Sequence, residues 1–197
     1  MFFRSTPKYL DALLVVALAW WTLALFWIAL APRRVTPVAA AVAGVLALVP
    51  AWVALARMLY ITNGTQWLLF ALVLVWTADI GAFFVGRRYG RVRLAPEVSP
   101  GKTWEGVLGG IAASTVIALL GAYWFGIPHA KFVLLCLAVV GYSIVGDLTE
   151  SLLKRYAGVK DSGHVFPGHG GMMDRIDSVT GAAPVLLFGL IALGVAS

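Results

Sequence analysis

The residues that could do chemistry gather in one polar stretch of an otherwise apolar chain. The sequence is 61% hydrophobic and only 12% charged, yet five of its nine acidic residues fall within positions 147–177. These are Asp147, Glu150, Asp161, Asp174 and Asp177. Lysines, arginines, histidines and glycines share the stretch. Carboxylates suit a hard cation, basic groups suit phosphate oxygens, and glycines let the backbone approach a ligand. The pattern indicates a phosphate-handling metal site.

The spacing of the polar residues favours a site over a merely solvated loop, which is the ordinary interpretation of a charged run. If the preceding helix continues, four side chains share one of its faces at i, i+3, i+4 and i+7. They are Asp147, Glu150, Ser151 and Lys154. Asp174 and Asp177 are again three apart, at the start of the last apolar run. Two aligned acid pairs therefore flank a glycine-rich connection.

This stretch resembles the signature of the bacterial phosphatidate cytidylyltransferases, the CDP-diacylglycerol synthases. The matching residues are Ser151, Lys154-Arg155, Lys160-Asp161, Gly163, Pro167, His169-Gly170-Gly171, Asp174-Arg175 and Asp177. Residues 79–82 with Gly86-Arg87, and residues 99–106, are also similar to the family, so the resemblance covers roughly residues 75 to 180. The family usually carries further spans ahead of this region, and we therefore expect a short form.

The resemblance implies a reaction in which phosphatidate and CTP give CDP-diacylglycerol and pyrophosphate. It implies Mg²⁺, with room for a second cation, and residue roles that fall into three sets. The metal set is Asp147 and Asp174, with Glu150 and Asp177 beside them. The phosphate-handling set is Lys154, Arg155, Lys160, Arg175 and His169, with Asp161 alongside. The nucleotide-binding set is Ser99, Lys102, Asp79, Gly170 and Gly171.

Ser99-Pro100 has a local interpretation of its own. Serine is a favoured N-cap and proline suits the first helical turn, so we expect a helix to begin here. Its N-terminus, with Lys102 beside it, would face an anion. Asp79 lies well inside an apolar run, where an acid is costly and is a functional candidate by default. The alternative is that its carboxyl group reaches water at the interface.

The fold expected is all-α and polytopic, with about six transmembrane helices. The apolar runs are continuous rather than alternating, which favours helices over membrane strands. We place the spans near 12–31, 38–56, 67–86, 106–125, 132–148 and 179–195. The chain forms one transmembrane domain, 1–197, in which 1–66 is less diagnostic and 67–180 is catalytic. We expect the single cysteine, Cys136, to serve packing.

Charge asymmetry predicts the orientation. Eleven of the fifteen lysines and arginines fall on one side of a six-span arrangement, and the positive-inside rule makes that side cytoplasmic. The active site then faces the cytoplasm from a bacterial inner membrane, and both termini face out. Since the basic residues lie beside spans, the net charge of +6 concerns the bilayer and not nucleic acid.

Two other functions stay open on the sequence alone. A CTP-dependent polyprenol or dolichol-type lipid kinase would share the membrane setting and the nucleotide. A transporter or structural membrane protein is the non-enzyme alternative, although it would disperse its charges along a central path. We also expect a homodimer, because small residues in the spans allow close helix packing with a second copy. These residues are Gly109, Gly110, Gly121 and Gly181.

Overall fold

Six helices and one short hairpin make up the regular structure of the computed structural model, which describes residues 8–163 and 171–195. The helices are α1 (Lys8–Leu30), α2 (Pro37–Met58), α3 (Gly64–Tyr89), α4 (Trp104–Phe125), α5 (His129–Tyr156) and α6 (Met173–Ala192). All six are long and apolar enough to cross a membrane, which confirms the predicted all-α, six-span architecture.

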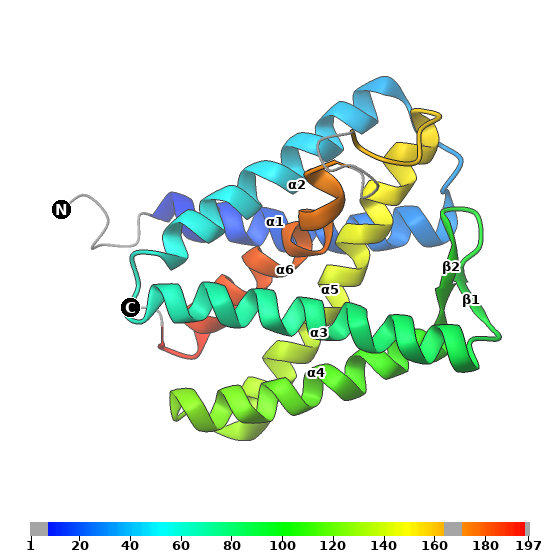
Figure 1. Cartoon of the computed structure of the whole chain (residues 1–197). Helices are drawn as coiled ribbons and strands as arrows, with labels where there is room; N and C mark the ends of the chain where they lie inside the picture. The colour runs from blue at the N-terminus through cyan, green and yellow to red at the C-terminus, as the bar shows by residue number, and fades with distance from the viewer. Residues whose placement is uncertain (1–7, 164–170, 196–197) are drawn as a thin grey trace.

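Helices α3 and α4 form the tightest pair in the bundle and lie side by side in Figure 1. A Cβ added at Gly109 would lie 2.5 Å from the side chain of Val85, and one at Gly81 would lie 2.8 Å from the Gly109 carbonyl oxygen. Only glycine fits such an approach of two backbones. Because lipid tails are as apolar as leucine, close packing of this kind supplies the association energy of membrane helices.

Helix α5 crosses the bundle diagonally and packs against α6, again through glycines (Figure 1). A Cβ at Gly181 would lie 2.2 Å from the Tyr142 carbonyl oxygen, and one at Gly146 would lie 2.7 Å from the Asp177 carbonyl oxygen. The second contact brings the Asp177 backbone against α5 next to Asp147. The α5–α6 crossing thus positions the acidic residues.

The glycines expected to meet a second copy are used within one chain. Gly109 and Gly110 face α3, Gly121 faces Phe70 and Phe132, and Gly181 faces α5. The predicted role of these glycines is therefore wrong, because intrachain neighbours already occupy the space beside them. Cys136 is fully buried in the main core cluster, as expected for a packing residue.

The hairpin was not predicted. Strand β1 (Arg93–Ala95) pairs antiparallel with β2 (Ser99–Thr103), and α4 begins only at Trp104. The expected helix start at Ser99-Pro100 is therefore wrong. Thr103 is the N-cap instead, since its Oγ1 accepts a hydrogen bond from the Gly106 N–H at 3.1 Å.

The pairing within the hairpin is irregular in a way that matters for Lys102. Arg93 faces Thr103 while Ala95 faces Ser99, so β2 carries extra residues over this interval. Such a bulge re-aims side chains and accommodates a proline that cannot donate to the ladder. The Pro100-Gly101-Lys102 run occupies the bulge, and Val98, in the turn before it, is buried against Leu148 and Leu152 of α5.

Two predicted spans were too short because their ends carry charged residues. Helix α5 does not stop at residue 148 but continues to Tyr156, and α6 begins at Met173 instead of 179. The last turns of α5 and the first turns of α6 carry polar residues on the faces that pack against each other. The acids therefore shorten the apolar run in the sequence without ending the helix. The predicted alignment of Asp147, Glu150, Ser151 and Lys154 along one face of α5 is confirmed, with Ser151 Oγ donating to Asp147 Oδ1 at 3.4 Å.

Candidate active site

Four carboxyl groups from three helices form the centre of the site, which we call the acidic centre. They are Asp79 on α3, Asp147 and Glu150 on α5, and Asp177 on α6. The charge of Asp79 interacts with those of Asp147 and Asp177, and Glu150 and Asp177 approach each other closely. Ser178 Oγ donates to Asp79 Oδ2 at 3.4 Å. Asp79 thus lies against polar groups of α5 and α6, and the residue is itself exposed.

Two lysines hold the acidic centre from opposite sides. Lys102, on the bulge of β2, forms a close ion pair with Asp147. Lys154 lies one turn after Glu150 on α5, with its Nζ 3.6 Å from Glu150 Oε2 and 2.7 Å from Asp174 Oδ1. Both lysines are largely buried, with side-chain exposures of 26% and 15%. The hairpin and α6 are thereby each tied to α5 by a cation.

Asp174 anchors the connection between α5 and α6. Its Oδ2 accepts from the Gly171 N–H at 2.7 Å, and from the Ser162 N–H and Oγ at 2.9 Å each. Its Oδ1 accepts from Lys154 Nζ. One carboxylate in the first turn of α6 therefore gathers both ends of the loop. Its charge also suits the positive end of the helix dipole.

Glu150 differs from Asp174 in that, within the part of the chain that the structure describes, its carboxylate accepts no hydrogen bond and has only Lys154 Nζ, 3.6 Å from Oε2, as a neighbouring cation. Among the described residues neither Oε1 nor Oε2 of Glu150 has a hydrogen-bond partner, although both oxygens are buried. Leaving a charged acceptor buried and unsatisfied is costly. Two close carboxylates, Glu150 and Asp177, need a shared proton or a cation between them. This pair is therefore a place where a cation would be stabilising.

The donor set fits a hard divalent cation, although the side chains are not arranged as a ready-made metal site. No three His, Cys, Asp or Glu side chains within 8–163 and 171–195 converge on a single point. The acidic centre nevertheless offers carboxylate oxygens, which Mg²⁺ prefers, and among them are the Glu150 oxygens that accept no hydrogen bond from the described residues. The predicted assignment of Mg²⁺ to Asp147, Glu150, Asp174 and Asp177 stays a prediction.

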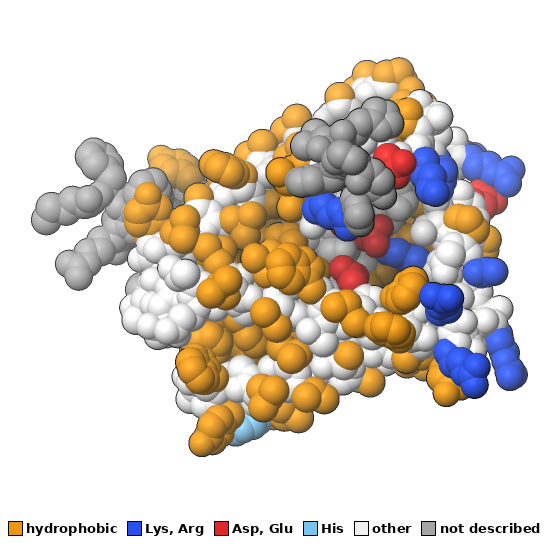
Figure 2. Space-filling model, in the orientation of Figure 1, with side chains coloured by type: hydrophobic (Ala, Val, Ile, Leu, Met, Phe, Trp, Pro, Cys, Tyr) orange, Lys and Arg blue, Asp and Glu red, His pale blue; other side chains and the backbone are white. Residues whose placement is uncertain are grey.

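A polar cavity of about 530 Å³ adjoins the acidic centre on the hairpin side. Asp79 and Asp147 form one wall, and three basic side chains, Arg87, Arg93 and Lys102, form others. Gly86, Gly101 and Gly106 contribute bare backbone to the lining, and apolar side chains complete it. Figure 2 shows acidic side chains in a hollow of this face, with basic side chains between them and the hairpin end. Carboxylates beside cations and glycines suit a phosphorylated ligand with its metal.

Arg87 and Arg93 were not among the predicted site residues. The sequence offered a signal for them, because the loop 87–103 holds five basic residues. Arg87 also belongs to the Gly86-Arg87 pair of the family resemblance, whereas nothing in the sequence separates Arg93 from its neighbours, since the turn of α3 into β1 decides which side chains face inward. Ser162 and Ser178 were also missed, and ordinary serines in a polar stretch give no signal.

The remaining predicted residues lie around the centre. Arg155 is exposed, and its Nε donates to the Val98 carbonyl oxygen at 3.5 Å, so it faces the hairpin. Ser99 lies at the start of β2, Gly171 donates to Asp174, and Arg175 is exposed on the first turn of α6. Lys160 and Asp161 are exposed in the loop after α5. His169 and Gly170 lie outside the described residues.

Comparisons with known proteins identify the family of this chain. The model of the cytidylyltransferase family matches residues 1–192. A phosphatidate cytidylyltransferase of Pseudomonas aeruginosa is 45% identical over 203 residues, which cover 95% of this chain and 72% of that protein. One of Haemophilus influenzae is 40% identical over 198 residues, covering 92% of this chain and 69% of that protein. One of Bacillus subtilis is 43% identical over 132 residues, covering 66% and 49%.

The match spans both the helices and the signature, so it tests the assignment made from the motif residues. The predicted resemblance and the predicted enzyme class, a nucleotidyltransferase, are confirmed. The six apolar helices make this chain a multi-pass membrane protein. A centre of carboxylates and lysines within six spans, together with a family match over nearly its whole length, shows that this chain belongs to the cytidylyltransferase family.

Proposed function

We propose that this protein is a phosphatidate cytidylyltransferase, which transfers CMP from CTP to phosphatidate and releases pyrophosphate. The observation that carries the proposal is the position of the polar cavity. Its basic and glycine residues adjoin the acidic centre inside a bundle of membrane helices. A water-soluble triphosphate and a lipid phosphate can meet at such a place. The names of the relatives support the same reaction.

In this reaction an oxygen of the lipid phosphate forms a bond to the α-phosphorus of CTP. The bond from that phosphorus to the oxygen bridging to the β-phosphate breaks, and pyrophosphate leaves. The attacking oxygen is already anionic, so no strong general base is needed. The protein must instead hold two mutually repelling phosphates together and stabilise charge on the leaving group.

The residues of the polar cavity suit this task. Arg87, Arg93 and Lys102 would hold the triphosphate, because all three line the cavity that the glycines open. Lys154 lies on the far side of the acidic centre, near Glu150 and Asp174, where it would receive the lipid phosphate. Fixed cations on both reactants lower their repulsion and orient them in line.

A divalent metal belongs to the proposal as well. Mg²⁺ would be held by Asp147, Glu150 and Asp177 of the acidic centre, and Asp174, beside that centre, is a further candidate. When bound, it supplies Lewis-acid stabilisation of charge on phosphate oxygens. Lys102 already pairs with Asp147, and so stands where it can neutralise that carboxylate or turn to a phosphate.

An apolar groove supports a lipid as the acceptor. A space of about 670 Å³ between α2, α3 and α6 is lined almost entirely by apolar side chains. Ile176 and Thr180 of α6 line it, and Asp177 lies between them on the same two turns. Acyl chains in this groove would place a headgroup near the start of α6. A water-soluble acceptor would not need an apolar groove beside the acidic centre.

Orientation and assembly complete the proposal. Both polar loops face the cytoplasm of a bacterial inner membrane, where CTP is available, because the basic residues concentrate at that end. The homodimer also remains part of it, although the glycines no longer support it. Turnover from nanodiscs that hold one copy each would test the dimer, with full activity from single copies counting against it.

The assay that tests the function uses purified protein with CTP, Mg²⁺ and either phosphatidate or a polyprenol. We expect pyrophosphate release and a CDP-lipid product when phosphatidate is the acceptor, and no product when a polyprenol is the acceptor. A phosphorylated polyprenol, with no product from phosphatidate, would instead identify the CTP-dependent lipid kinase. Absence of turnover with both, from protein that remains folded, would favour a non-enzymatic membrane role.

A further inference from the structure

A second groove lies on the other flank of the hairpin and takes no part in the proposed reaction. It has a volume of about 720 Å³ and is bounded by the last turns of α1, the hairpin and α5. We call it the α1 groove and define it by Leu25, Ile28, Arg33, Arg34, Leu94 and Leu148. Leu94 also lines the polar cavity, so β1 forms a wall shared by both.

The deeper part of the α1 groove is apolar and lies at membrane depth. Leu25 and Ile28 belong to the last two turns of the first span, which ends at Leu30. Leu30 is 79% exposed and Leu25 is 47% exposed, so the groove opens toward the bilayer. Leu94 and Leu148 close it on the protein side. A hydrocarbon chain can enter it sideways from the membrane without crossing water.

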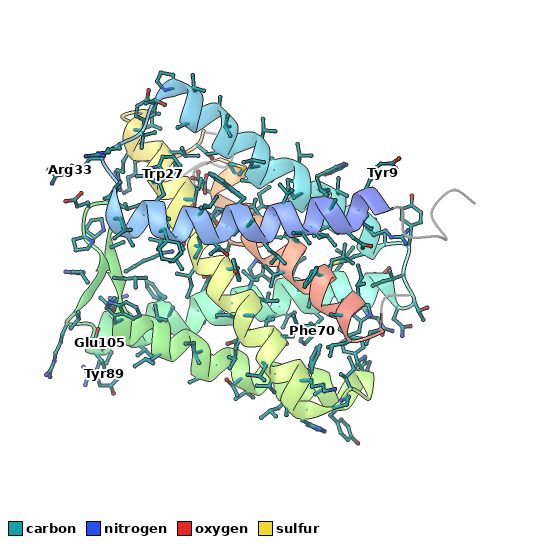
Figure 3. The ribbon with its side chains drawn as sticks, turned by 180° about the vertical axis from the view of Figure 1, so that it is seen from behind. Tyr9, Trp27, Arg33, Phe70, Tyr89 and Glu105 are labelled. Atoms are coloured by element: carbon teal, nitrogen blue, oxygen red, sulfur yellow. The ribbon has the colours of Figure 1, made fainter. Side chains whose placement is uncertain are left out.

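The other end of the α1 groove is basic. Arg33 and Arg34 follow the end of the span directly, at the level where lipid headgroups lie. Figure 3 shows Arg33 at this end of α1, with Tyr9 at the opposite end of the same helix. Arg33 is held in place by Glu97, which accepts from its Nε at 3.0 Å and from its Nη2 at 2.8 Å.

Arg34 completes the basic end and has its charge available. It is exposed, and its guanidinium makes no hydrogen bond or ion pair with any residue of the ranges 8–163 and 171–195. The Arg33–Glu97 pair is neutral as a unit, so Arg34 gives the mouth of the groove its net positive charge. An apolar trough that ends in one available guanidinium matches an acyl chain joined to an anionic phosphate.

We propose that the α1 groove binds one phospholipid with an anionic headgroup. An acyl chain lies along Leu25 and Ile28, and the headgroup phosphate pairs with Arg34. Two observations support this assignment: the apolar part of the α1 groove lies at membrane depth, and the end of the groove at Arg34 is positively charged. A zwitterionic lipid would satisfy the trough but would bring no net charge to Arg34, so the groove discriminates between lipids by charge. The site is separate from the acidic centre and needs no nucleotide or metal.

The experiment measures retained lipid directly and does not depend on enzymatic activity. The protein is reconstituted in nanodiscs of mixed phosphatidylglycerol and phosphatidylcholine, released into mild detergent and weighed by native mass spectrometry. Phosphatidylglycerol is a phosphodiester and so differs from the proposed substrate. Arg34→Glu reverses the charge at the mouth. Ala29→Trp, on the exposed rim of the groove, fills the trough and leaves the charges alone. Arg88→Glu is the matched control, because Arg88 is an exposed basic residue that does not line this groove.

We expect the wild type and Arg88→Glu to retain one phosphatidylglycerol in preference to phosphatidylcholine. Arg34→Glu should lower that retention by at least about tenfold, since two units of charge change at the headgroup. Ala29→Trp should lower retention of both lipids. Equal losses for Arg34→Glu and Arg88→Glu, with none for Ala29→Trp, would reduce the effect to general attraction and overturn the proposal. So would a cross-link from a cysteine at Ala29 to a second protein chain, because a protein segment would then fill the groove.

Discussion

Lys102 and Asp147 form an ion pair that joins the hairpin to the middle of α5. Lys102 is placed by the bulge in β2, and Asp147 by the close crossing of α5 and α6 at Gly146 and Gly181. Two otherwise unrelated pieces of architecture therefore meet at this one contact. It stands between the polar cavity, which both residues line, and the remaining acids of the site.

Removing either member of this pair should cost most of the activity. We expect Lys102→Met and Asp147→Asn each to lower the rate of CDP-lipid formation by about 10²-fold or more, as loss of charge stabilisation at a phosphoryl centre does. Lys131→Met is the control, since Lys131 is exposed at the opposite end of α5. Near-normal turnover in either variant, at ordinary Mg²⁺, would remove the pair from the site.

Magnesium should bind the folded protein before any substrate does. We expect added Mg²⁺ to raise the melting temperature of the wild type, because a ligand that binds only the native state stabilises it. Asp147→Asn and Glu150→Gln should weaken or abolish that rise, and EDTA should abolish wild-type turnover. A Mg²⁺-dependent rise that is unchanged in both variants would place the metal elsewhere.

Asp174 should act on the loop between α5 and α6 as well as on the reaction. An asparagine offers one accepting oxygen where the aspartate offers two, so either Lys154 or the loop donors Gly171 and Ser162 lose their partner. We expect Asp174→Asn to lower activity by about 10²-fold, in proportion to lost charge stabilisation, and to speed tryptic cleavage after the exposed Lys160. Ser162→Ala removes a single hydroxyl and should give an intermediate cleavage rate. Cleavage at the wild-type rate in Asp174→Asn would contradict the anchoring role.

The contact between α3 and α4 should be intolerant of a single methyl group. A Cβ at Gly109 would overlap Val85, so we expect Gly109→Ala to lower the free energy of unfolding in detergent by about 1–3 kcal/mol. Gly141→Ala is the matched control, because Gly141 is a helical glycine with nothing within 4 Å of an added Cβ. That substitution should be neutral or stabilising. Equal stabilities for the two variants would show that the helices can separate without cost.

The orientation can be tested with single cysteines at Arg91 and Ser162, both exposed, in a Cys136→Ala background. If the polar loops are cytoplasmic, a membrane-impermeant thiol reagent should leave both unlabelled in intact cells and label both after lysis. Labelling of both in intact cells would invert the topology.

The helices and the polar face of α5 could be predicted because both depend on local pattern. Apolar runs define spans, and the spacing from Asp147 to Lys154 holds wherever the helix continues. The hairpin could not be predicted, because Ser99–Thr103 has little strand propensity and becomes a strand only by pairing with β1. Local rules favoured a helix start there, and Thr103 rather than Ser99 provides the cap.

Other parts of the site depend on which elements become neighbours. Gly109 and Gly181 indicate close helix contact in the sequence, but they do not indicate whether the contact is within the chain or with another chain. Asp174 looked like a metal ligand by its place in the motif, whereas its oxygens are engaged by the loop and Lys154. Asp79 was singled out by depth alone, and its partners on α5 and α6 became visible only in three dimensions.

The bulge in β2 makes the length of this loop as constrained as any side chain in it. Glu105 and Trp104 fix one end of the hairpin through Val92, and the burial of Val98 fixes the other. Deleting or inserting one residue between Val98 and Thr103 would have to be absorbed at the bulge, and Lys102 would then project to a different side. Homologous chains should therefore keep the number of residues in this interval as strictly as they keep Lys102 itself.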